Sequence, residues 1–378
     1  MEDTPVRGLE GVIAADTKIC SLDGVNGILG YYGYDVPEMV RKKVTFEEIV
    51  YLLWHGELPT RERLKEFDGA MKAERALSPG MLRALKQIPP GEQRTAALRG
   101  GVGIQGLFDE EAEDDSPEAN RRKALRLTAK MPTIVAAQHR LAEGLKPLNP
   151  RRGLGHAANF LYMITGQAPD KIDARALDAT LVLYAEHEFN ASTFATRVVT
   201  STMSDIYSAV TAGISALKGP LHGGAGLAVM ETLREIGDIE NVEPFVEAAL
   251  ARKRLFMGFG HRVYTKSGDP RASVLIELAE EVCHQPGRDA KWFDMARALD
   301  HAVQSRKGVI PNVDFYSAPL WQGLGIPMEL FVPIIAMSRV AGWTANILEQ
   351  QADNRLIRPR ARYTGPDKRP YRTMRSRG

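Results

Sequence analysis

Apolar side chains recur at helical spacing along nearly the whole sequence after Pro37. The segment Thr45–His55 shows this most clearly, because Thr45 suits the N-cap position and Glu47 and Glu48 follow in the first turn. Strict apolar–polar alternation, the pattern of strands, is nearly absent after the first thirty-odd residues. We therefore expect a mainly α protein with a short extended or β segment at its N-terminus. Further helices are expected near residues 61–77, 80–88, 117–143, 154–165, 173–187, 192–201, 204–217, 224–236, 242–254, 270–284, 288–306 and 327–350.

The chain has enough residues and enough apolar side chains for two helical domains. Its 378 residues are 44% hydrophobic and 25% charged, which excludes collagen-like, disordered and disulfide-scaffold proteins. Glycine-rich turns at 219–226 and 323–325 bracket an internal segment, as hinges would. We expect a large domain of residues 1–221 and 319–378, and a small domain of residues 222–318.

The sequence shows no feature of an exported or membrane protein. The longest apolar run, Leu330–Met337, is far shorter than the roughly 20 residues of a membrane-spanning helix. The N-terminal M-E-D-T-P-V-R-G has the plan of neither a signal peptide nor a transit peptide. Two cysteines, Cys20 and Cys283, make no disulfide framework and fit a reducing compartment. We expect a soluble cytoplasmic protein.

The net charge of +2 is unevenly distributed along the chain. Residues 355–378 carry nine basic side chains and one acidic side chain, so the preceding part of the chain is acidic overall. Such a tail can bind nucleic acid, remain a solvated arm, or lend arginine to an anion site. No basic surface with interleaved aromatic residues occurs elsewhere in the sequence, so nucleic-acid binding is not expected.

One glycine motif imitates a dinucleotide-binding fingerprint. Residues Gly101–Gly106 read G-V-G-I-Q-G, but the fingerprint needs an apolar strand before it and an apolar-faced helix after it. Here R-T-A-A-L-R-G precedes the motif, and the acidic run Asp109–Asp115, expected to be a solvated loop, follows it. We therefore expect no dinucleotide site.

Three polar residues lie in turns that glycine or proline shapes, among apolar neighbours. His222 lies in G-P-L-H-G-G-A-G, His261 in M-G-F-G-H-R-V-Y, and Asp314 in I-P-N-V-D-F-Y-S-A. Glycine lets the backbone approach a ligand and leaves N–H groups free to bind it. Taken singly, each residue could equally be a helix cap or a buried structural side chain. Their spacing matches no zinc pattern, so no metal site is expected.

Three arginines and a further histidine are candidates for binding an anion. Arg339 interrupts the apolar helix L-F-V-P-I-I-A-M-S-R-V-A-G-W, where an unpaired guanidinium would be costly, so a protein or ligand carboxylate should meet it. Arg271 follows the helix start at Asp269, and Arg358 lies in the basic tail; a surface position is the ordinary interpretation of both. His187, in L-Y-A-E-H-E-F-N-A-S, ends an apolar helix.

Taken together, these segments resemble the citrate synthase family. The segments G-P-L-H-G-G-A-G, G-F-G-H-R-V-Y with D-P-R-A, and P-N-V-D-F-Y-S-A match its three signature blocks in order and spacing. The resemblance starts at R-G-L-E-G-V and continues through F-E-E-I-V-Y-L-L-W-H-G-E-L-P, A-E-H-E-F-N-A-S-T-F and R-P-R-A-R-Y-T-G. It implies the compact bacterial and archaeal form, an almost entirely helical homodimer whose small domain closes over the substrate.

The resemblance also implies an activity. A citrate synthase is an acyltransferase that condenses acetyl-CoA with oxaloacetate and hydrolyses citryl-CoA to citrate and CoA, without a cofactor. The related 2-methylcitrate synthase uses propionyl-CoA, and one methyl group discriminates by only ~1–3 kcal/mol, so the acyl donor stays open. A non-catalytic helical scaffold or ligand sensor is the alternative from another class. The presence of His222, His261 and Asp314 counts against it.

The resemblance assigns a role to each candidate residue. Asp314 is expected to take a proton from the acetyl-CoA methyl group, His222 to hydrogen-bond the thioester oxygen as it becomes an enol or enolate, and His261 to polarise the oxaloacetate carbonyl. The residues expected to bind oxaloacetate are His187, Arg271, Arg339 and Arg358, the last from the partner subunit. The residues expected to contact CoA are Leu255, Gly258, Phe259, Gly260, Arg262 and Lys266. Which of Arg262 and Lys266 meets the CoA phosphates stays open.

Overall fold

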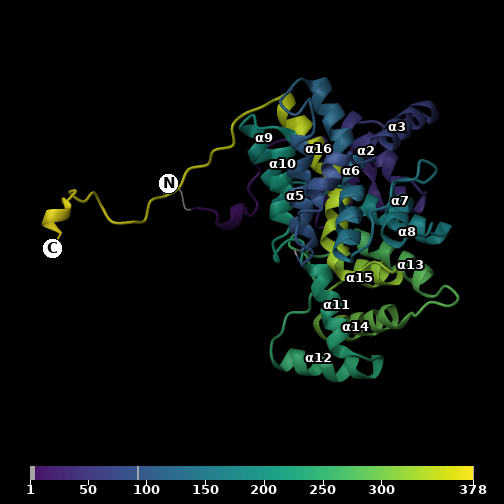
Figure 1. Cartoon of the computed structure of the whole chain (residues 1–378). Coiled ribbons are helices and arrows are strands. Elements are labelled where there is room, and N and C mark those ends of the chain that lie inside the picture. Colours follow the sequence, from purple (N-terminus) through teal and green to yellow (C-terminus); the bar gives the residue numbers. More distant parts are fainter. Residues whose placement is uncertain (1–4, 92, 378) are drawn as a thin grey trace.

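Helices make up most of the computed structural model, which describes residues 5–91 and 93–377. Within this part of the chain the sheet is small and antiparallel, formed near the N-terminus by β1 (Cys20–Asp23), β2 (Ile28–Tyr31) and β3 (Tyr34–Asp35). Figure 1 shows the helices packed into one tall body with both chain ends on the same side. The expected mainly α fold with a short N-terminal β segment is confirmed.

All of the expected helices are present, and local capping chemistry explains where many of them begin. The Thr45 side chain accepts the backbone N–H of Glu48 while the Glu48 carboxylate accepts the N–H of Thr45, a complete capping box. The helices are α1 (Val36–Arg41), α2 (Phe46–His55), α3 (Arg61–Glu74), α4 (Pro79–Leu85), α5 (Arg94–Leu107), α6 (Pro117–Ala142), α7 (His156–Thr165), α8 (Lys171–Tyr184), α9 (Ala191–Ser201), α10 (Ile206–Leu217), α11 (Ala225–Ile236), α12 (Val242–Ala251), α13 (Pro270–Cys283), α14 (Lys291–Lys307), α15 (Val313–Gly323) and α16 (Phe331–Ala352).

Helix α5 was not expected from the sequence, because glycine lowers helix propensity. The motif Gly101–Gly106 lies inside this helix rather than at a turn between a strand and a helix. A Cβ on Gly101 would meet Ile134 of α6 at 2.5 Å, and a Cβ on Gly106 would meet Tyr207 of α10 at 3.0 Å. The glycines therefore let three helices pack closely, which a single-sequence pattern does not show.

Helix α16 forms the centre of the upper body and packs against α2, α6, α8, α9 and α10 (Figure 1). By length and hydropathy alone, Met328–Ala352 could span a membrane, and it is much longer than the apolar run Leu330–Met337. However, 94% of its apolar window is buried among the other helices. Its apolar character is therefore that of a core helix.

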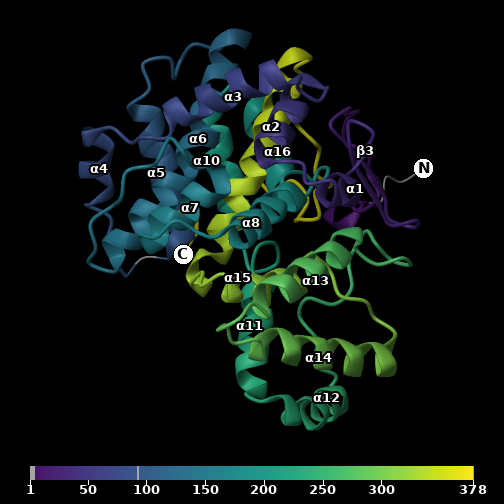
Figure 2. The same cartoon turned by 90° about the vertical axis from the view of Figure 1, so that its right-hand side faces the viewer.

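A second group of helices lies below this body. Figure 2 shows α11, α12 and α14 in green at the bottom, with α13 and α15 between them and the upper helices. Helix α15 packs against α11, α13 and α14. Helices α11, α12, α13 and α14 come from the segment expected to form the small domain, whereas α15 runs past residue 318 to Gly323. The boundaries at residues 222 and 318 stay a prediction.

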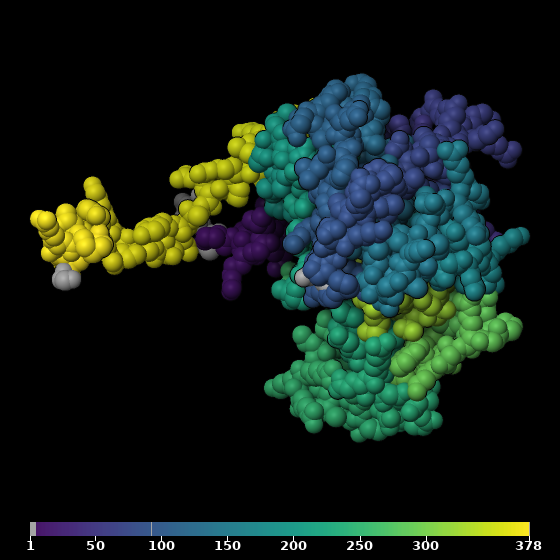
Figure 3. Space-filling model, viewed as in Figure 1, coloured from purple at the N-terminus to yellow at the C-terminus, as the bar shows by residue number. Residues whose placement is uncertain are grey.

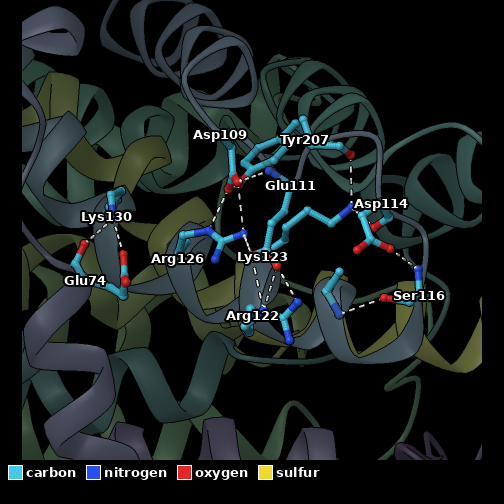
Figure 4. A network of polar contacts seen from close by, with 12 residues as sticks. Glu74, Asp109, Glu111, Asp114, Ser116, Arg122, Lys123, Arg126, Lys130 and Tyr207 are labelled. Carbon is cyan, nitrogen blue, oxygen red and sulfur yellow. Dashed lines mark hydrogen bonds and ion pairs between the residues drawn. The ribbon is translucent and has the colours of Figure 1, made fainter.

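The acidic run Asp109–Asp115 is a loop, as expected, but it is tied to α6 rather than simply solvated. Arg126 donates to the Asp109 carboxylate at 2.6 Å, and Tyr207 of α10 bonds the same carboxylate (Figure 4). Lys123 is fully buried, and its ammonium donates to two backbone carbonyls of the loop. The loop therefore joins α6 to α10, and the expectation of a solvated loop was wrong for Asp109.

The basic tail leaves α16 beside the C-terminal end of α9. The Ile357 N–H donates to Ser201 Oγ at 3.0 Å, and beyond this contact the tail is exposed. Figure 3 shows the tail in yellow as an arm that extends away from the body, on the same side as the N-terminal segment in purple.

Candidate active site

The predicted catalytic residues converge where the C-terminal end of α8 meets the starts of α9, α11, α13 and α15. Helix α8 packs against α13, and α15 packs against both α11 and α13 (Figure 2). The ring centroids of His187 and His261 lie 5.3 Å apart. Tyr184 links α8 to the side chain of Asp314. The fold thus brings together residues that are 130 positions apart in the sequence.

His222 lies in the turn before α11 and contacts the start of α9. The backbone N–H of Ser192 donates to His222 Nε2 at 3.3 Å, and Ser192 Oγ lies 2.9 Å from the same nitrogen. Burial, and then the positive charge of Arg339, lowers the pKa of His222 to about 4. The ring is therefore neutral near pH 7. Because Nε2 accepts a hydrogen bond, we assign the ring proton to Nδ1.

His261 is held in the opposite tautomer. The backbone N–H groups of Val263 and Tyr264 lie 3.0 and 3.3 Å from His261 Nδ1, which therefore accepts. Burial, and then the charge of Arg271, lowers the pKa of His261 to about 4. The neutral ring carries its proton on Nε2 and can donate it to a ligand.

His187 is buried directly beside His261. Its Nε2 lies 3.1 Å from the Tyr264 hydroxyl, and the Tyr264 ring also lies 4.8 Å from the His261 ring. Burial, and then the charge of Arg271, holds the pKa of His187 well below its ordinary value. Tyr264 orders both histidines, and sequence analysis missed it although it lies in the H-R-V-Y block.

Asp314 lies in the first turn of helix α15, which was not expected from the sequence. Its backbone N–H donates to the side chain of Asn312, the N-cap. The Tyr184 hydroxyl donates to Asp314 Oδ1 at 2.8 Å and lies 3.0 Å from Ser317 Oγ. Burial raises the pKa of the Asp314 carboxyl, while the Tyr184 hydrogen bond and the charge of Arg271 oppose this shift. The carboxylate is therefore a stronger base than an exposed aspartate. Tyr184 was also missed.

Arg271 is fully buried and already has a carboxylate partner. Asp269 accepts its Nε at 2.9 Å and its Nη2 at 2.7 Å. The same carboxylate accepts the N–H of Val313 at the start of α15. Asp269 was predicted only as a helix cap, which it also is. The structure adds that it joins α13, which carries Arg271, to α15, which carries Asp314.

Arg339 projects from the central helix α16 into the same region. Its Nε donates to the Tyr184 carbonyl at 2.7 Å, and the residue is 4% exposed. Within residues 5–91 and 93–377, no carboxylate oxygen lies within 4.0 Å of its guanidinium nitrogens. Buried Glu186 is nearby, and burial raises the pKa of this carboxyl to about 7 although Arg339 opposes the shift. Arg339 can therefore accept a carboxylate from a ligand.

The segment predicted to contact CoA lies beside the catalytic residues. Gly260 donates its N–H to the Ile310 carbonyl at 2.9 Å, and the Phe259 ring lies 4.5 Å from the Phe315 ring. Gly258 has φ +80°, and a Cβ there would meet Val229 at 2.6 Å, so only glycine fits. These contacts place His261 next to α15. The side chains of the remaining predicted CoA residues are exposed, namely Leu255, Arg262 and Lys266.

Arg358 does not reach this cluster within its own chain. It is exposed in the tail, one residue after Ile357, which contacts Ser201 at the C-terminal end of α9. The cluster lies at the other end of that helix, where Ser192 contacts His222. The structure therefore brings together His187, His222, His261, Arg271, Asp314 and Arg339, and leaves Arg358 apart.

Comparisons with known proteins agree on one family. The family model described as citrate synthase, C-terminal domain, matches residues 8–360. "Citrate synthase 2" of Bacillus subtilis is 48% identical over 369 residues, which cover 97% of this chain and 98% of that protein. A "2-methylcitrate synthase" of Mycobacterium tuberculosis is 43% identical, over 96% of this chain and 91% of that protein.

Solved structures give the same result. The citrate synthase of Pyrobaculum aerophilum matches with a TM-score of 0.91 and 41% identity, over 99% of this chain and 95% of that chain. The citrate synthase of Thermoplasma acidophilum, in a ternary complex with carboxymethyl coenzyme A and oxaloacetate, also has a TM-score of 0.91. It is 32% identical, over 98% of this chain and 99% of that chain. The chain belongs to the citrate synthase family, whose members are enzymes that transfer an acyl group.

Proposed function

We propose that the cluster around Asp314 condenses acetyl-CoA with oxaloacetate and then hydrolyses citryl-CoA to citrate and CoA. The observation that carries this proposal is the convergence of Asp314 with histidine rings whose tautomers are fixed by backbone hydrogen bonds. Burial raises the pKa of the Asp314 carboxyl. In His222 and in His261 a backbone N–H holds one ring nitrogen, which leaves the other nitrogen to carry the proton of the neutral ring. A base beside two neutral hydrogen-bond donors is the set of groups that this reaction needs.

Asp314 is the proposed base for the acetyl methyl group. A thioester methyl is a far weaker acid than a carboxylic acid, and each pK unit of mismatch costs about 1.4 kcal/mol. The raised pKa of Asp314 reduces the pK difference between the methyl group and the carboxyl but does not remove it. A second group must therefore stabilise the charge that develops on the thioester oxygen as the proton leaves.

His222 is the proposed donor to that oxygen. Its Nε2 is held by Ser192, which leaves Nδ1–H for the substrate. A neutral donor can share its proton with the developing enolate, and the low pKa of His222 keeps the ring neutral in the closed site. Asp314 accepts the methyl proton, and the electron pair of the C–H bond becomes the nucleophile.

Oxaloacetate supplies the electrophile and two carboxylates. His261 Nε2–H is proposed to polarise the keto carbonyl, and its proton can pass to the alkoxide formed when the new carbon–carbon bond closes. The carboxylates are proposed to meet His187, Arg271 and Arg339, of which Arg339 lacks a carboxylate partner in the described part of its own chain. Water then cleaves the thioester, and no metal or redox cofactor takes part in this scheme.

The CoA moiety is proposed to lie along the segment of residues 255–260. Its backbone is fixed against Ile310 and Asn312, directly before helix α15, which carries Asp314 in its first turn. This arrangement would bring the thioester end of CoA toward the base. The exposed side chains of Arg262 and Lys266 are the candidates for the CoA phosphates.

We further propose a homodimer in which Arg358 completes the site of the partner subunit. Both terminal segments extend from the same side of the body (Figure 3). They expose large apolar side chains that a second copy could cover, namely Val6, Leu9, Val12, Ile13, Leu356, Tyr363, Tyr371 and Met374. A protein with Arg358→Ala mixed with one carrying His222→Ala should regain activity in heterodimers, because one site keeps both residues. No recovery despite demonstrated subunit exchange would place Arg358 outside the partner's site.

The proposed location is the cytoplasm, where both buried cysteines, Cys20 and Cys283, would stay reduced thiols. The basic tail is assigned to the partner subunit rather than to nucleic acid. A tail that bound nucleic acid would do so with strong salt dependence, and truncation after Gly365 would abolish this binding while leaving catalysis intact.

Release of free thiol from acetyl-CoA and, in parallel, from propionyl-CoA tests the activity, each with and without oxaloacetate. Release that depends on oxaloacetate is the expected result, with the higher kcat/KM for acetyl-CoA. A higher value for propionyl-CoA would instead favour 2-methylcitrate synthase, the name that one of the relatives carries. No release from either donor by folded protein that binds oxaloacetate would contradict the catalytic assignments.

A further inference from the structure

Glu186 is a buried carboxyl beside the catalytic cluster, and no step of the proposed reaction uses it. The residue is 1% exposed and directly precedes His187 in the chain. Within residues 5–91 and 93–377, no basic side-chain nitrogen lies within 4.0 Å of its carboxylate oxygens. Burying a carboxylate without an ion pair is costly, so the ionised form of Glu186 depends on charges that lie near it without contact.

One face of helix α16 receives this carboxyl. Arg339, Gly342 and Asn346 follow one another at spacings of three and four residues, so they lie on the same face of the helix. A Cβ on Gly342 would meet the Ala185 carbonyl oxygen at 2.3 Å and Glu186 Oε2 at 2.1 Å, so only glycine fits there. Asn346 Nδ2 donates to Glu186 Oε2 at 3.3 Å. The carboxyl therefore lies against the backbone of α16, about one turn from Arg339.

Arg339 is the cation that lacks a carboxylate partner beside Glu186. The other cation nearby, Arg197 of α9, pairs with Glu349 at 2.8 Å. The Asn346 amide lies between Arg197 and Glu186, since its Oδ1 accepts from Arg197 Nη1 at 3.0 Å while its Nδ2 donates to Glu186. Burial raises the pKa of Glu186 to about 7, and the charge of Arg339 is the largest cause that opposes this shift. The charge of Glu186 near neutral pH is therefore sensitive to what else Arg339 binds.

The other titratable groups near Glu186 are neutral at this pH or paired. Burial raises the pKa of the Cys20 thiol and of the Tyr31 hydroxyl, so both keep their protons. The pKa of His187 lies well below its ordinary value, so its ring is neutral. The complete set is Arg339 and Glu349 of α16, Arg197 of α9, Cys20 of β1, Tyr31 of β2, and the chain neighbours His187 and Glu188.

We propose that Glu186 balances the charge of Arg339 in the empty site and takes up a proton from the solvent when a carboxylate of oxaloacetate binds Arg339. The arriving carboxylate adds negative charge beside Glu186 and offsets the positive charge of Arg339, and both changes favour the protonated carboxyl. Glu186 acts through Arg339 rather than on a reacting atom, so it is a positioning residue. This proposal rests on the proposed function, because it takes oxaloacetate as the ligand.

Proton uptake during binding tests the proposal directly. Calorimetric titration of the full chain with oxaloacetate at pH 7.5, in two buffers of different ionisation enthalpy, gives the number of protons taken up. The unchanged protein should take up at least about half a proton per site, and Glu186→Gln, which keeps the size of the side chain, about half a proton less. The matched control Glu188→Gln removes an exposed carboxylate two residues along the chain and should equal the unchanged protein.

The affinity for oxaloacetate should depend on pH through the same carboxyl. Because the bound state holds the extra proton, the Kd of the unchanged protein should rise about tenfold from pH 6.5 to pH 8.5. The Kd of Glu186→Gln should change less than about twofold over this range and should be the lower of the two at pH 8.5. A purely structural side chain would behave differently, since its replacement would weaken binding at every pH.

Infrared difference spectra decide the matter if Glu186→Gln does not fold. They are recorded on Asp314→Asn, so that Asp314 contributes no signal, and oxaloacetate at pH 7.5 should convert one carboxylate to a carboxylic acid. Equal proton uptake by Glu186→Gln and the unchanged protein, or spectra without a new acid band although oxaloacetate binds, would overturn this proposal and leave the proposed function standing. Absence of oxaloacetate binding by the folded, unchanged protein would overturn both.

Discussion

Two regions of the molecule bury neutral histidines, and they do so in different ways. In the catalytic cluster a backbone N–H holds one nitrogen of His222 and of His261, which leaves the other nitrogen with the proton. In the core beside Phe46 of α2, neither nitrogen of His156 is held within the described chain. Burial is the main cause of the lowered pKa in all three cases, with the charge of a nearby arginine as the second cause. A backbone hydrogen bond is what selects the tautomer and hence the position of the donor.

Removing the proposed base, Asp314, from the catalytic cluster should have the largest effect. Asp314→Asn should lower kcat by about a thousandfold, since general-base catalysis is worth 10²–10⁴-fold. Oxaloacetate binding should change little, because the base acts on the other substrate. Steady-state kinetics together with calorimetric titration of oxaloacetate would check this. A large loss of oxaloacetate affinity would place Asp314 in the oxaloacetate site instead.

Removing His261, a hydrogen-bond donor whose tautomer is fixed, should affect both the binding of oxaloacetate and the turnover. His261→Ala should lower kcat by about a hundredfold, the usual cost of losing one preorganised donor, and should also weaken oxaloacetate binding. The same two measurements apply to this variant. Unchanged affinity for oxaloacetate would contradict the role assigned to Nε2–H.

The hydroxyl of Tyr184 should act on the pKa of the base. Its hydrogen bond stabilises the charged form of Asp314, so Tyr184→Phe should raise that pKa further and move the acidic limb of the kcat profile up by as much as about one pH unit. Activity is lost as pH falls through this pKa, because only the ionised carboxylate is a base. Tyr162→Phe on α7 is the matched control and should leave the profile in place. A profile that falls in amplitude without shifting would mean a purely structural role for Tyr184.

The smallest expected effect concerns the stability of the fold in acid, through buried His156. The pKa of His156 lies near 3 in the folded protein, below its ordinary value of 6.5 in an unfolded chain. Between these values only the unfolded chain binds the proton, so stability falls as pH falls through this range. His156→Phe removes this contribution and should make the fall of Tm between pH 6.5 and pH 4 shallower than in the unchanged protein. An equal slope in both proteins would show that His156 is protonated in the folded state.

Local chemistry explains which parts of the fold were predictable. The capping box of Thr45 and Glu48 lies within four residues, so the sequence shows where α2 begins. Helix α5 was missed because its glycines are needed for close packing against Ile134 and Tyr207, which lie on other helices. Helix α15 was missed because Pro311 and Asn312 suggest a turn, whereas Asn312 is in fact the cap of that helix.

In the active site, too, the features that are local in sequence were predictable and the contacts between distant residues were not. The sequence motifs identified His222, His261 and Asp314, but not the residues that form hydrogen bonds with their side chains. Ser192 and Tyr184 contact their partners across 30 and 130 residues of sequence, and no local pattern reports such a pair. Asp269 was seen as a cap, since its ion pair with Arg271 and its bond to α15 exist only in the folded chain.

Nuclear magnetic resonance of the histidine side chains tests the tautomer assignment most directly. In protein labelled with ¹⁵N in its histidines, long-range correlations distinguish protonated from bare ring nitrogens, and His222→Ala and His261→Ala identify the two rings. At pH 7 the account predicts a proton on Nδ1 of His222 and on Nε2 of His261, with both rings neutral down to about pH 5. The same tautomer in both rings, or a charged imidazolium in either at pH 7, would contradict it.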